Sequence, residues 1–434
     1  MSDPIRLLHF ADLHVGMENY GRLDPVTGLA SRVRDFLDRL DEVIDYALAH
    51  EVDLVVFAGD AFKTRDPDPT QQREFARRIK RLADAAPTLL LVGNHDLPGT
   101  AAKATAVDIF HALDVPNVIV GHRDGSRLVE TKRGPVWLAW MPYPMRNRLL
   151  SLDEHRGKSV EALDLALRDV VTSIIRDFAD EAEGQAMPRV LAGHFSVSEA
   201  KYGSERSVML GRDVAILKSE LANPVWDYVA LGHIHRYQNL TAFDGAGGQG
   251  SREAEDRSLA PPHPHTPVTF PPVVYSGSLE RIDFGEEREA KGFCWVELER
   301  GGTRYEFVAV HARPFVTLQT DVRAADDPTD GVLAEIAAAR QRTADAVVRL
   351  IVKLRAEQEP GLREREIHRA LASAYNVTLH KEVEHAARVR LGGIAPETMT
   401  PSQLVAQYFK SKDYDPAQVD KLVEYAEAII NSNR

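Results

Sequence analysis

Short apolar runs alternate with longer amphipathic stretches over the first 235 residues of the chain. Runs rich in Val, Leu and Ile are typical of buried strands, and here they read IRLLHFA, VDLVVFA, PTLLLV, RVLA and DYVAL. Between them, apolar residues recur at helical spacing over residues 31–50, 70–86 and 159–182. This order predicts an α/β fold, with a layered sheet that carries helices on its faces.

The pattern becomes rich in strands after residue 235. Four strand-like runs follow, which read RYQNLTAF, PPVVYSGS, GFCWVELE and TRYEFVAV. Residues 244–272 interrupt them, and their Gly, Ser and Pro content predicts a flexible surface insertion. We therefore predict a first domain over residues 1–312 that includes this insertion.

Composition shifts near residue 313, where a second pattern begins. Strand-like runs at 315–322, 346–356 and 376–384 alternate with helix-like runs at 332–340 and 362–374. They predict a small α+β domain over residues 313–390, within the usual size range of domains. A linker over residues 391–399 leads from it to the last segment.

Residues 400–434 predict a pair of short helices. Thr400-Pro-Ser-Gln403 and Asp415-Pro-Ala-Gln418 both match a capping box with proline at the first helical position. Each helix has an apolar face, and two short helices cannot bury such faces alone because helices gain most of their stability from tertiary packing. The pair either docks on this chain or binds a partner, and the pattern alone does not separate the two.

Charge and cysteine content narrow the function classes. The net charge is −12, from 53 Lys plus Arg against 65 Asp plus Glu. An acidic chain is not typical of nucleic-acid binding, because Lys and Arg are needed to neutralise phosphates. It does not exclude it, since bound divalent cations add positive charge that a formal count misses. A single cysteine, Cys294, rules out an internal disulfide and a thiolate zinc framework, and we expect it to pack within a strand. No signal peptide or membrane-length apolar run is evident, so we expect a soluble, cytoplasmic protein.

Five polar motifs follow the apolar runs, one at each predicted strand end. Sites in α/β folds lie at the carboxyl ends of parallel strands, so five such ends can converge. The candidate metal ligands in the motifs are Asp12, His14, Asp60, Asn94, His194, His233 and His235. They offer oxygen and imidazole nitrogen without sulfur, which suits Mn²⁺, Fe or Mg²⁺ better than structural zinc. Two ions about 3.5–4 Å apart, bridged by Asp60, would clamp both oxygens of a phosphoryl displacement.

Two residues of the third motif are left for other roles. His95 would face the phosphate and stabilise or protonate the leaving oxygen, and Asp96 would orient it. The remaining histidines are interpreted as structural or as solvated loop residues, because a lone histidine rarely marks a site. They include His9, His111, His311, His263 and His265.

The ordered motifs resemble those of the calcineurin-like metallophosphoesterases, and in particular the SbcD-type DNA double-strand-break repair exonucleases. The residues that carry the resemblance are Asp12-Leu-His-Val-Gly, Gly59-Asp-Ala-Phe, Gly93-Asn-His-Asp, Gly232-His-Ile-His, Ala200-Lys-Tyr-Gly-Ser-Glu and Tyr275-Ser-Gly-Ser-Leu-Glu-Arg-Ile-Asp-Phe-Gly-Glu. The small downstream domain is also similar, so the resemblance covers nearly the whole chain. It implies a β-sandwich flanked by helices, with the small domain capping the site and helping to select DNA.

The resemblance also implies a division of the ligands and a set of partners. One Mn²⁺ would be bound by Asp12, His14, Asp60 and His235, and the other by Asp60, Asn94, His194 and His233. His95 would be the catalytic histidine. Residues 400–434 would bind the coiled coil of an SbcC-type ATPase, and the chain would form a homodimer. The activity implied is Mn²⁺-dependent cleavage of DNA, as an exonuclease on duplex ends and an endonuclease on single strands and hairpins.

Two alternatives use the same motifs. A phosphatase or small phosphodiesterase of the superfamily would need the same metals, but its second motif typically reads Gly-Asp-x-x-Asp-Arg, whereas this chain has Gly59-Asp-Ala-Phe-Lys-Thr-Arg. A scaffold that mainly binds the ATPase would not need an intact ligand set. Lys63 stands where relatives often carry His or Asp, so no role is transferred to it, and the resemblance assigns no role to the insertion at 244–272.

Overall fold

The computed structural model describes residues 3–98, 103–145, 159–203, 213–242, 270–384, 400–410, 412 and 414–432. The predicted linker at 391–399 and nearly all of the predicted insertion at 244–272 lie outside these ranges. The chain forms two compact units. Unit 1 comprises Met1–Thr317, Gln341–Val348 and Ser373–Val377, and unit 2 comprises Leu318–Arg340, Arg349–Ala372 and Thr378–Arg434. The division predicted at residues 312, 390 and 399 stays a prediction.

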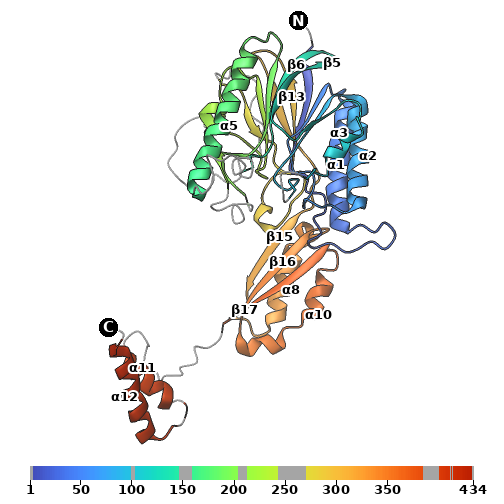
Figure 1. Cartoon of the computed structure of the whole chain (residues 1–434). Helices are drawn as coiled ribbons and strands as arrows, with labels where there is room; N and C mark the ends of the chain where they lie inside the picture. Colours follow the sequence, from blue (N-terminus) through green and yellow to red (C-terminus); the bar gives the residue numbers. More distant parts are fainter. Residues whose placement is uncertain are drawn as a thin grey trace. The chain divides into compact units, whose positions relative to one another are not determined.

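Unit 1 contains two six-stranded sheets (Figure 1). The first sheet has the order β14-β13-β1-β2-β3-β4, with bounds β14 Arg304–Ala309, β13 Gly292–Leu298, β1 Ile5–Phe10, β2 Leu54–Phe57, β3 Thr88–Leu91 and β4 Val118–Gly121. The second has the order β11-β12-β10-β7-β6-β5, with bounds β11 Gln238–Asn239, β12 Val273–Tyr275, β10 Tyr228–Gly232, β7 Arg189–His194, β6 Gly134–Met141 and β5 Gly125–Thr131. A small two-stranded sheet joins β8 (Ser196–Val197) to β9 (Ala215–Ile216).

Helices cover the outer face of each sheet. In Figure 1, α1 (Ser31–Ala49), α2 (Pro69–Ala85) and α3 (Asp108–Ala112) flank the first sheet, and α5 (Val160–Glu183) flanks the second. The Asp68 carboxylate caps α2 by accepting from the backbone of Thr70 over 2.7 Å, with proline at the first helical position. The long helices α1, α2 and α5 confirm the predicted segments. The short elements are α7 (Lys218–Leu221), α9 (Arg340–Thr343), η3 (Phe284–Glu286) and η4 (Ala356–Gly361).

Alternate residues of each strand point to opposite cores, because side chains alternate across a strand. Leu7 and Leu54 of the first sheet share a core with Val190 and Ala230 of the second. Leu8 packs instead in the core under α1 and α2, and a third core joins the second sheet to α5. The central strands pair in parallel and are buried on both faces, which explains their unbroken apolar runs. The layered α/β sandwich flanked by helices is thus confirmed.

Some elements had no counterpart in the sequence interpretation. The β5–β6 hairpin, β4 and α3 all lie in a stretch of moderate polarity, where the exposed face of β5 breaks up the apolar signal. The run at 236–243 contributes only the two-residue strand β11. Cys294 is fully buried in β13, as expected.

Three strands form a separate small sheet, in the order β15-β16-β17. They are β15 (Phe315–Asp321), β16 (Val347–Arg355) and β17 (Asn376–Glu384), and the helices α8 (Pro328–Ala338) and α10 (Glu364–Ala370) accompany them. The predicted start of α8 at residue 332 is wrong. The helix begins at Pro328, because the Asp327 carboxylate accepts from the amides of Thr329 and Asp330 and so caps the helix one turn before the predicted start.

The predicted C-terminal helices are confirmed as α11 (Pro401–Lys410) and α12 (Pro416–Ser432). The first shows both bonds of the predicted capping box. The backbone of Thr400 donates to Gln403 Oε1 over 2.8 Å, and the backbone of Gln403 donates to Thr400 Oγ1 over 3.3 Å. Among the described residues, no helix combines the length and apolar character that crossing a bilayer requires.

Candidate metal centre

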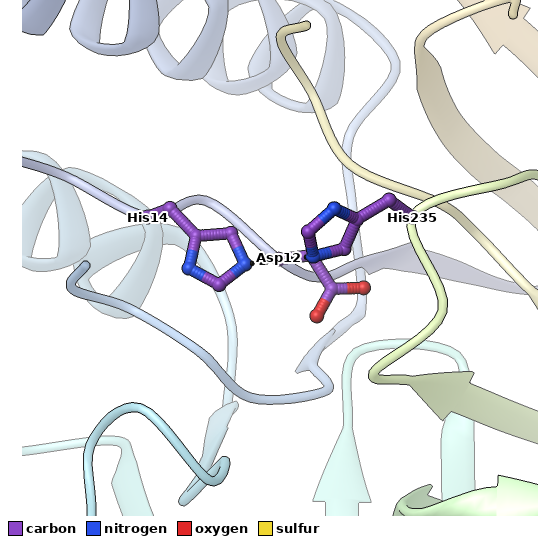
Figure 2. Close-up of side chains that lie close together, drawn as sticks. All are labelled: Asp12, His14 and His235. Carbon is purple, nitrogen blue, oxygen red and sulfur yellow. Dashed lines mark hydrogen bonds between the residues drawn. The ribbon is translucent and has the colours of Figure 1, made fainter. Parts of the chain in front are cut away.

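The loops after five central strands bring the predicted ligands together. Strands β1, β2 and β3 of the first sheet supply four of them, and β7 and β10 of the second supply three. Their donor atoms form groups in which every pair lies within 4.8 Å, and these groups are Asp12 with His14 and His235, Asp60 with His194 and His233, and His14 with Asp60 and His95. Figure 2 shows the first group, in which the rings of His14 and His235 lie next to each other beside Asp12, with their planes inclined by 63°.

Asp60 occupies the middle of the cluster. Its Oδ2 lies 3.7 Å from His14 Nε2 on one side and 3.4 Å from His194 Nε2 on the other. Asn94 Oδ1 lies 3.1 Å from His194 Nε2 and 2.8 Å from His233 Nδ1, so the asparagine joins the second group. Asp60 thus belongs to two of the groups, and its role as a bridge between two ions stays a prediction.

The backbone at the cluster is unusual. Asp12, His14, Asp60 and His233 have φ angles of 52°, 47°, 60° and 98°, in the left-handed region that side chains other than glycine rarely adopt. Such strain persists where surrounding structure enforces it, and it gathers at functional sites. Gly59 shows the crowding, because a Cβ there would overlap the His194 ring. The glycine of the Gly-Asp motif is therefore required by close approach as well as by its φ of 100°.

Three histidines use their outer nitrogen as a donor. His194 Nδ1 donates to the Ala58 carbonyl over 2.6 Å, His233 Nε2 donates to Asp213 Oδ2 over 2.7 Å, and His235 Nδ1 donates to Glu286 Oε1 over 2.9 Å. In a neutral imidazole the other nitrogen is then a lone-pair acceptor. This fixes the tautomer of each ring with its lone pair directed into the cluster.

The inward nitrogens face other acceptors. His194 Nε2 faces the Asp60 carboxylate, and His235 Nε2 lies 3.0 Å from His14 Nε2. Lone pairs directed at one another and at carboxylates repel unless a cation lies between them. Burial alone would lower the pKa of His194, but the Asp60 carboxylate raises it to about 9, so without a metal ion the inward nitrogen would carry a proton against that carboxylate. The donor set and its orientation therefore fit bound metal ions.

His95 differs from the other histidines of the cluster in being exposed. Its Nδ1 donates to the Lys63 carbonyl over 2.7 Å, and its backbone amide donates to Asp60 Oδ1 over 2.8 Å. Its ring centroid lies 4.7 Å from that of His14. The ring is thus fixed through Nδ1 at the rim of the cluster, and Nε2 is left for a ligand or substrate.

Asp96 lies beneath the cluster, where its carboxylate accepts from backbone amides. The donors are Asp60, Ala61, Phe62 and Gly93, at 3.0–3.2 Å. The orienting contact of His95 is made by the Lys63 carbonyl, whereas the hydrogen bonds of Asp96 join the loop after β2 to the loop after β3. Asp96 therefore holds the backbone on which Asp60 sits.

Sequence interpretation missed the partners of the candidate ligand histidines. Asp213, Glu286 and Lys291 were given no role, although Glu286 closes the family-like stretch that begins at Tyr275. That position was the only signal available for it. Asp213 follows no apolar run, so its role becomes visible only through its contact with His233.

His9 shows how a structural histidine differs from these. It is buried between the sheets, where Nδ1 lies 3.0 Å from the Tyr228 hydroxyl and Nε2 lies 3.2 Å from the Leu231 carbonyl. Burial lowers its pKa to about 3, so the ring is neutral. The structural interpretation of His9 is confirmed.

Comparison with known proteins gives consistent matches. The profile of the calcineurin-like phosphoesterase family matches residues 5–237, more than half of the chain. The chain is 26% identical over 246 residues to the SbcD component of the nuclease SbcCD from Escherichia coli K12, covering 55% of this chain and 58% of that protein. It is 27% identical over 245 residues to the Bacillus subtilis protein of the same name, covering 54% and 58%.

A third relative aligns over a longer stretch. The chain is 23% identical over 336 residues to the DNA double-strand break repair protein Mre11 of Archaeoglobus fulgidus, covering 76% of this chain and 63% of that protein. The matches thus span 58–63% of the length of these three curated relatives.

Proposed function

Since the chain belongs to the calcineurin-like phosphoesterase family, we propose that it is a metal-dependent DNA phosphodiesterase, the nuclease component of an SbcCD-type repair complex. The observation that carries the proposal is the convergence of carboxylates and inward imidazole nitrogens at the carboxyl edges of both sheets. The names of the curated relatives support DNA as the substrate. The activity would be exonucleolytic on duplex ends and endonucleolytic on single strands and hairpins.

Two ions would occupy the cluster. Asp12, His14, Asp60 and His235 would hold one, and Asp60, Asn94, His194 and His233 would hold the other. Oxygen and imidazole ligands favour Mn²⁺, with Mg²⁺ or Fe as alternatives. When bound, such ions supply an acidified water and positive charge at the phosphate.

The protein's own residues would orient and protonate the substrate. His95 is exposed, and its Nδ1–H donates to the Lys63 carbonyl. In its doubly protonated form the ring would also present Nε2–H to the phosphate and give that proton to the leaving oxygen, which leaves a neutral imidazole. Asp96 would act indirectly, as a positioning residue. Its bonds to the amides of Asp60, Ala61 and Phe62 keep the bridging carboxylate in place.

The remaining parts would serve DNA and partners. Residues 1–312 would form the nuclease domain and residues 313–390 a cap that helps to select DNA. Two chains would form a homodimer, and residues 400–434 would bind the coiled coil of an SbcC-type ATPase. The helix pair supports this role, because every residue of α11 is at least partly exposed and Tyr408 and Tyr425 are 54% and 72% exposed. Aromatic residues are enriched at interfaces.

The activity is tested with Mn²⁺ and linear duplex DNA. We expect the parent to degrade the DNA and both Asp60→Ala and His95→Ala to lose this activity. His111→Ala, at an exposed histidine on α3, is the matched control and should retain it. If duplex and single-stranded DNA survive while a phosphopeptide or a cyclic nucleotide is hydrolysed, the substrate is not DNA and the alternative phosphoesterase function holds.

The partner segment is tested by deletion. A chain without residues 400–434 should fail to capture the ATPase while it keeps most of its Mn²⁺-dependent cleavage. Capture that survives the deletion would place the ATPase contact elsewhere on the chain.

A further inference from the structure

Three buried residues, His235, Glu286 and Lys291, form a closed ring of contacts beside the cluster. His235 Nδ1 donates to Glu286 Oε1 over 2.9 Å. Lys291 Nζ lies 2.9 Å from Glu286 Oε2, and the same ammonium donates to the backbone carbonyl of His235 over 3.1 Å. The ring of contacts therefore fixes His235 twice, through its imidazole and through its backbone. We call these three residues the His235 clamp.

The clamp is withdrawn from water. The side chains of Glu286 and Lys291 are both 0% exposed, and Glu286 also accepts from the Ile282 backbone over 3.0 Å. The carboxylate and the ammonium thus form a short ion pair away from water, and both of its members contact His235.

A buried ion pair is a poor means of stabilising a fold, since desolvation offsets most of the attraction between its charges. Its placement against an inward-facing imidazole suggests another use. A carboxylate that accepts from Nδ1 orients the ring and makes Nε2 a better electron donor. Lys291 places a positive charge 2.9 Å from the other oxygen of that carboxylate and so holds it in position against the ring.

We propose that Glu286 and Lys291 are positioning residues that set the metal affinity of His235. This inference rests on the proposed function, because it assumes that His235 binds a metal ion. It assigns a role to residues that lie outside the five strand-end motifs. A merely structural pair would change the stability of the protein and leave its metal affinity unchanged.

The test measures Mn²⁺ binding to the full-length, metal-stripped chain by titration calorimetry. We expect the parent to bind two ions, and Glu286→Gln to bind one of them about 10- to 100-fold more weakly. Lys291→Gln should weaken the same ion, because an amide cannot neutralise Glu286. Circular dichroism and thermal unfolding show which variants are folded, and either folded variant is enough for the test.

Glu289→Gln is the matched control. Glu289 pairs with the same Lys291 ammonium over 3.0 Å but lies outside the clamp. We therefore expect the Glu289→Gln variant to bind Mn²⁺ within about twofold of the parent affinity, a much smaller change than the loss expected for variants of the clamp. A double-mutant cycle adds the specific readout. If Glu286 acts through His235, Glu286→Gln has no further effect on Mn²⁺ binding in a His235→Ala background.

The outcomes separate the two proposals. Parent-like affinity in folded Glu286→Gln and Lys291→Gln, or full additivity in the cycle, overturns the clamp and leaves the proposed function intact. A parent that binds no Mn²⁺, Mg²⁺ or Fe²⁺ overturns the metal-dependent function and the clamp with it.

Discussion

His233 Nε2 donates to Asp213 Oδ2 over 2.7 Å, which gives the second candidate metal group a carboxylate partner like the one that Glu286 provides for His235. Asp213 is itself held by the hydroxyl of Ser196, by the Tyr143 hydroxyl at 3.2 Å and by the Val214 amide at 3.0 Å. These three donors are neutral, whereas Glu286 is held by the Lys291 ammonium. The two groups therefore have similar partners supported in different ways.

We predict that Asp213→Asn weakens the ion bound by His233 about 10- to 100-fold. The asparagine amide fits the same space, but its neutral oxygen is a weaker acceptor for the His233 Nε2–H than a carboxylate is, so it makes the other ring nitrogen a weaker electron donor. Mn²⁺ titration measures the loss, and Glu220→Gln, which breaks only the surface pair with Arg176, is the control. Unchanged binding of both ions would show that Asp213 does not support a ligand.

Asp96→Asn should destabilise the protein by about 2–4 kcal/mol, because an amide nitrogen would meet backbone donors that now bind a carboxylate. The same change should weaken Mn²⁺ binding through displacement of Asp60. Urea unfolding of the metal-free protein measures the first effect and titration the second. If Asp96 acted only on His95, the variant would lose cleavage with its stability and metal affinity intact.

Gly59→Ala should lower the free energy of unfolding by about 2–5 kcal/mol, since alanine would add both left-handed strain and overlap with His194. Gly134→Ala separates these effects, because Gly134 also has positive φ, 127°, but none of the described residues places an atom within 4 Å of its Cβ position. For this control we expect the free energy of unfolding to fall by only about 1–2 kcal/mol. Equal losses of unfolding free energy in the two variants would contradict the proposed crowding at His194.

The single thiol should report on unfolding. Burial raises the pKa of Cys294 to about 12 from its ordinary 9.0, so at about pH 8 the folded thiol should react at least about 1000-fold more slowly than the unfolded one. A chromogenic disulfide reagent measures the rate with and without urea. Fast labelling of the native protein would mean that the core between the sheets opens readily.

The same shift predicts how stability depends on alkaline pH. The folded pKa lies above the unfolded one, so the contribution is complete below about pH 9 and is lost as the pH rises toward about 12. Its slope is at most about 1.4 kcal/mol per pH unit. Urea midpoints should therefore fall less steeply with pH in Cys294→Ala than in the parent, and identical slopes would contradict the assignment.

The sequence was most informative where chemistry and local pattern coincide. Asp12 and His14 directly follow an apolar run, so their place at a strand end could be predicted together with their role as ligand candidates. Asp213 and Glu286 lie 20 and 51 residues from the histidines they contact, and no local pattern encodes such a meeting. The β5–β6 hairpin was not predicted, because one face of β5 is exposed and its polar residues interrupt the apolar pattern that marks a strand.

The seven candidate ligands are divided between two sheets and between distant parts of the chain. The first sheet provides those between residues 12 and 94, and the second provides those between residues 194 and 235. During synthesis, the ligand set is therefore incomplete until β10 has left the ribosome and packed beside β7. A nascent chain that ends before residue 235 would hold only part of the candidate set, so the proposed centre could form only after strands of both sheets have folded.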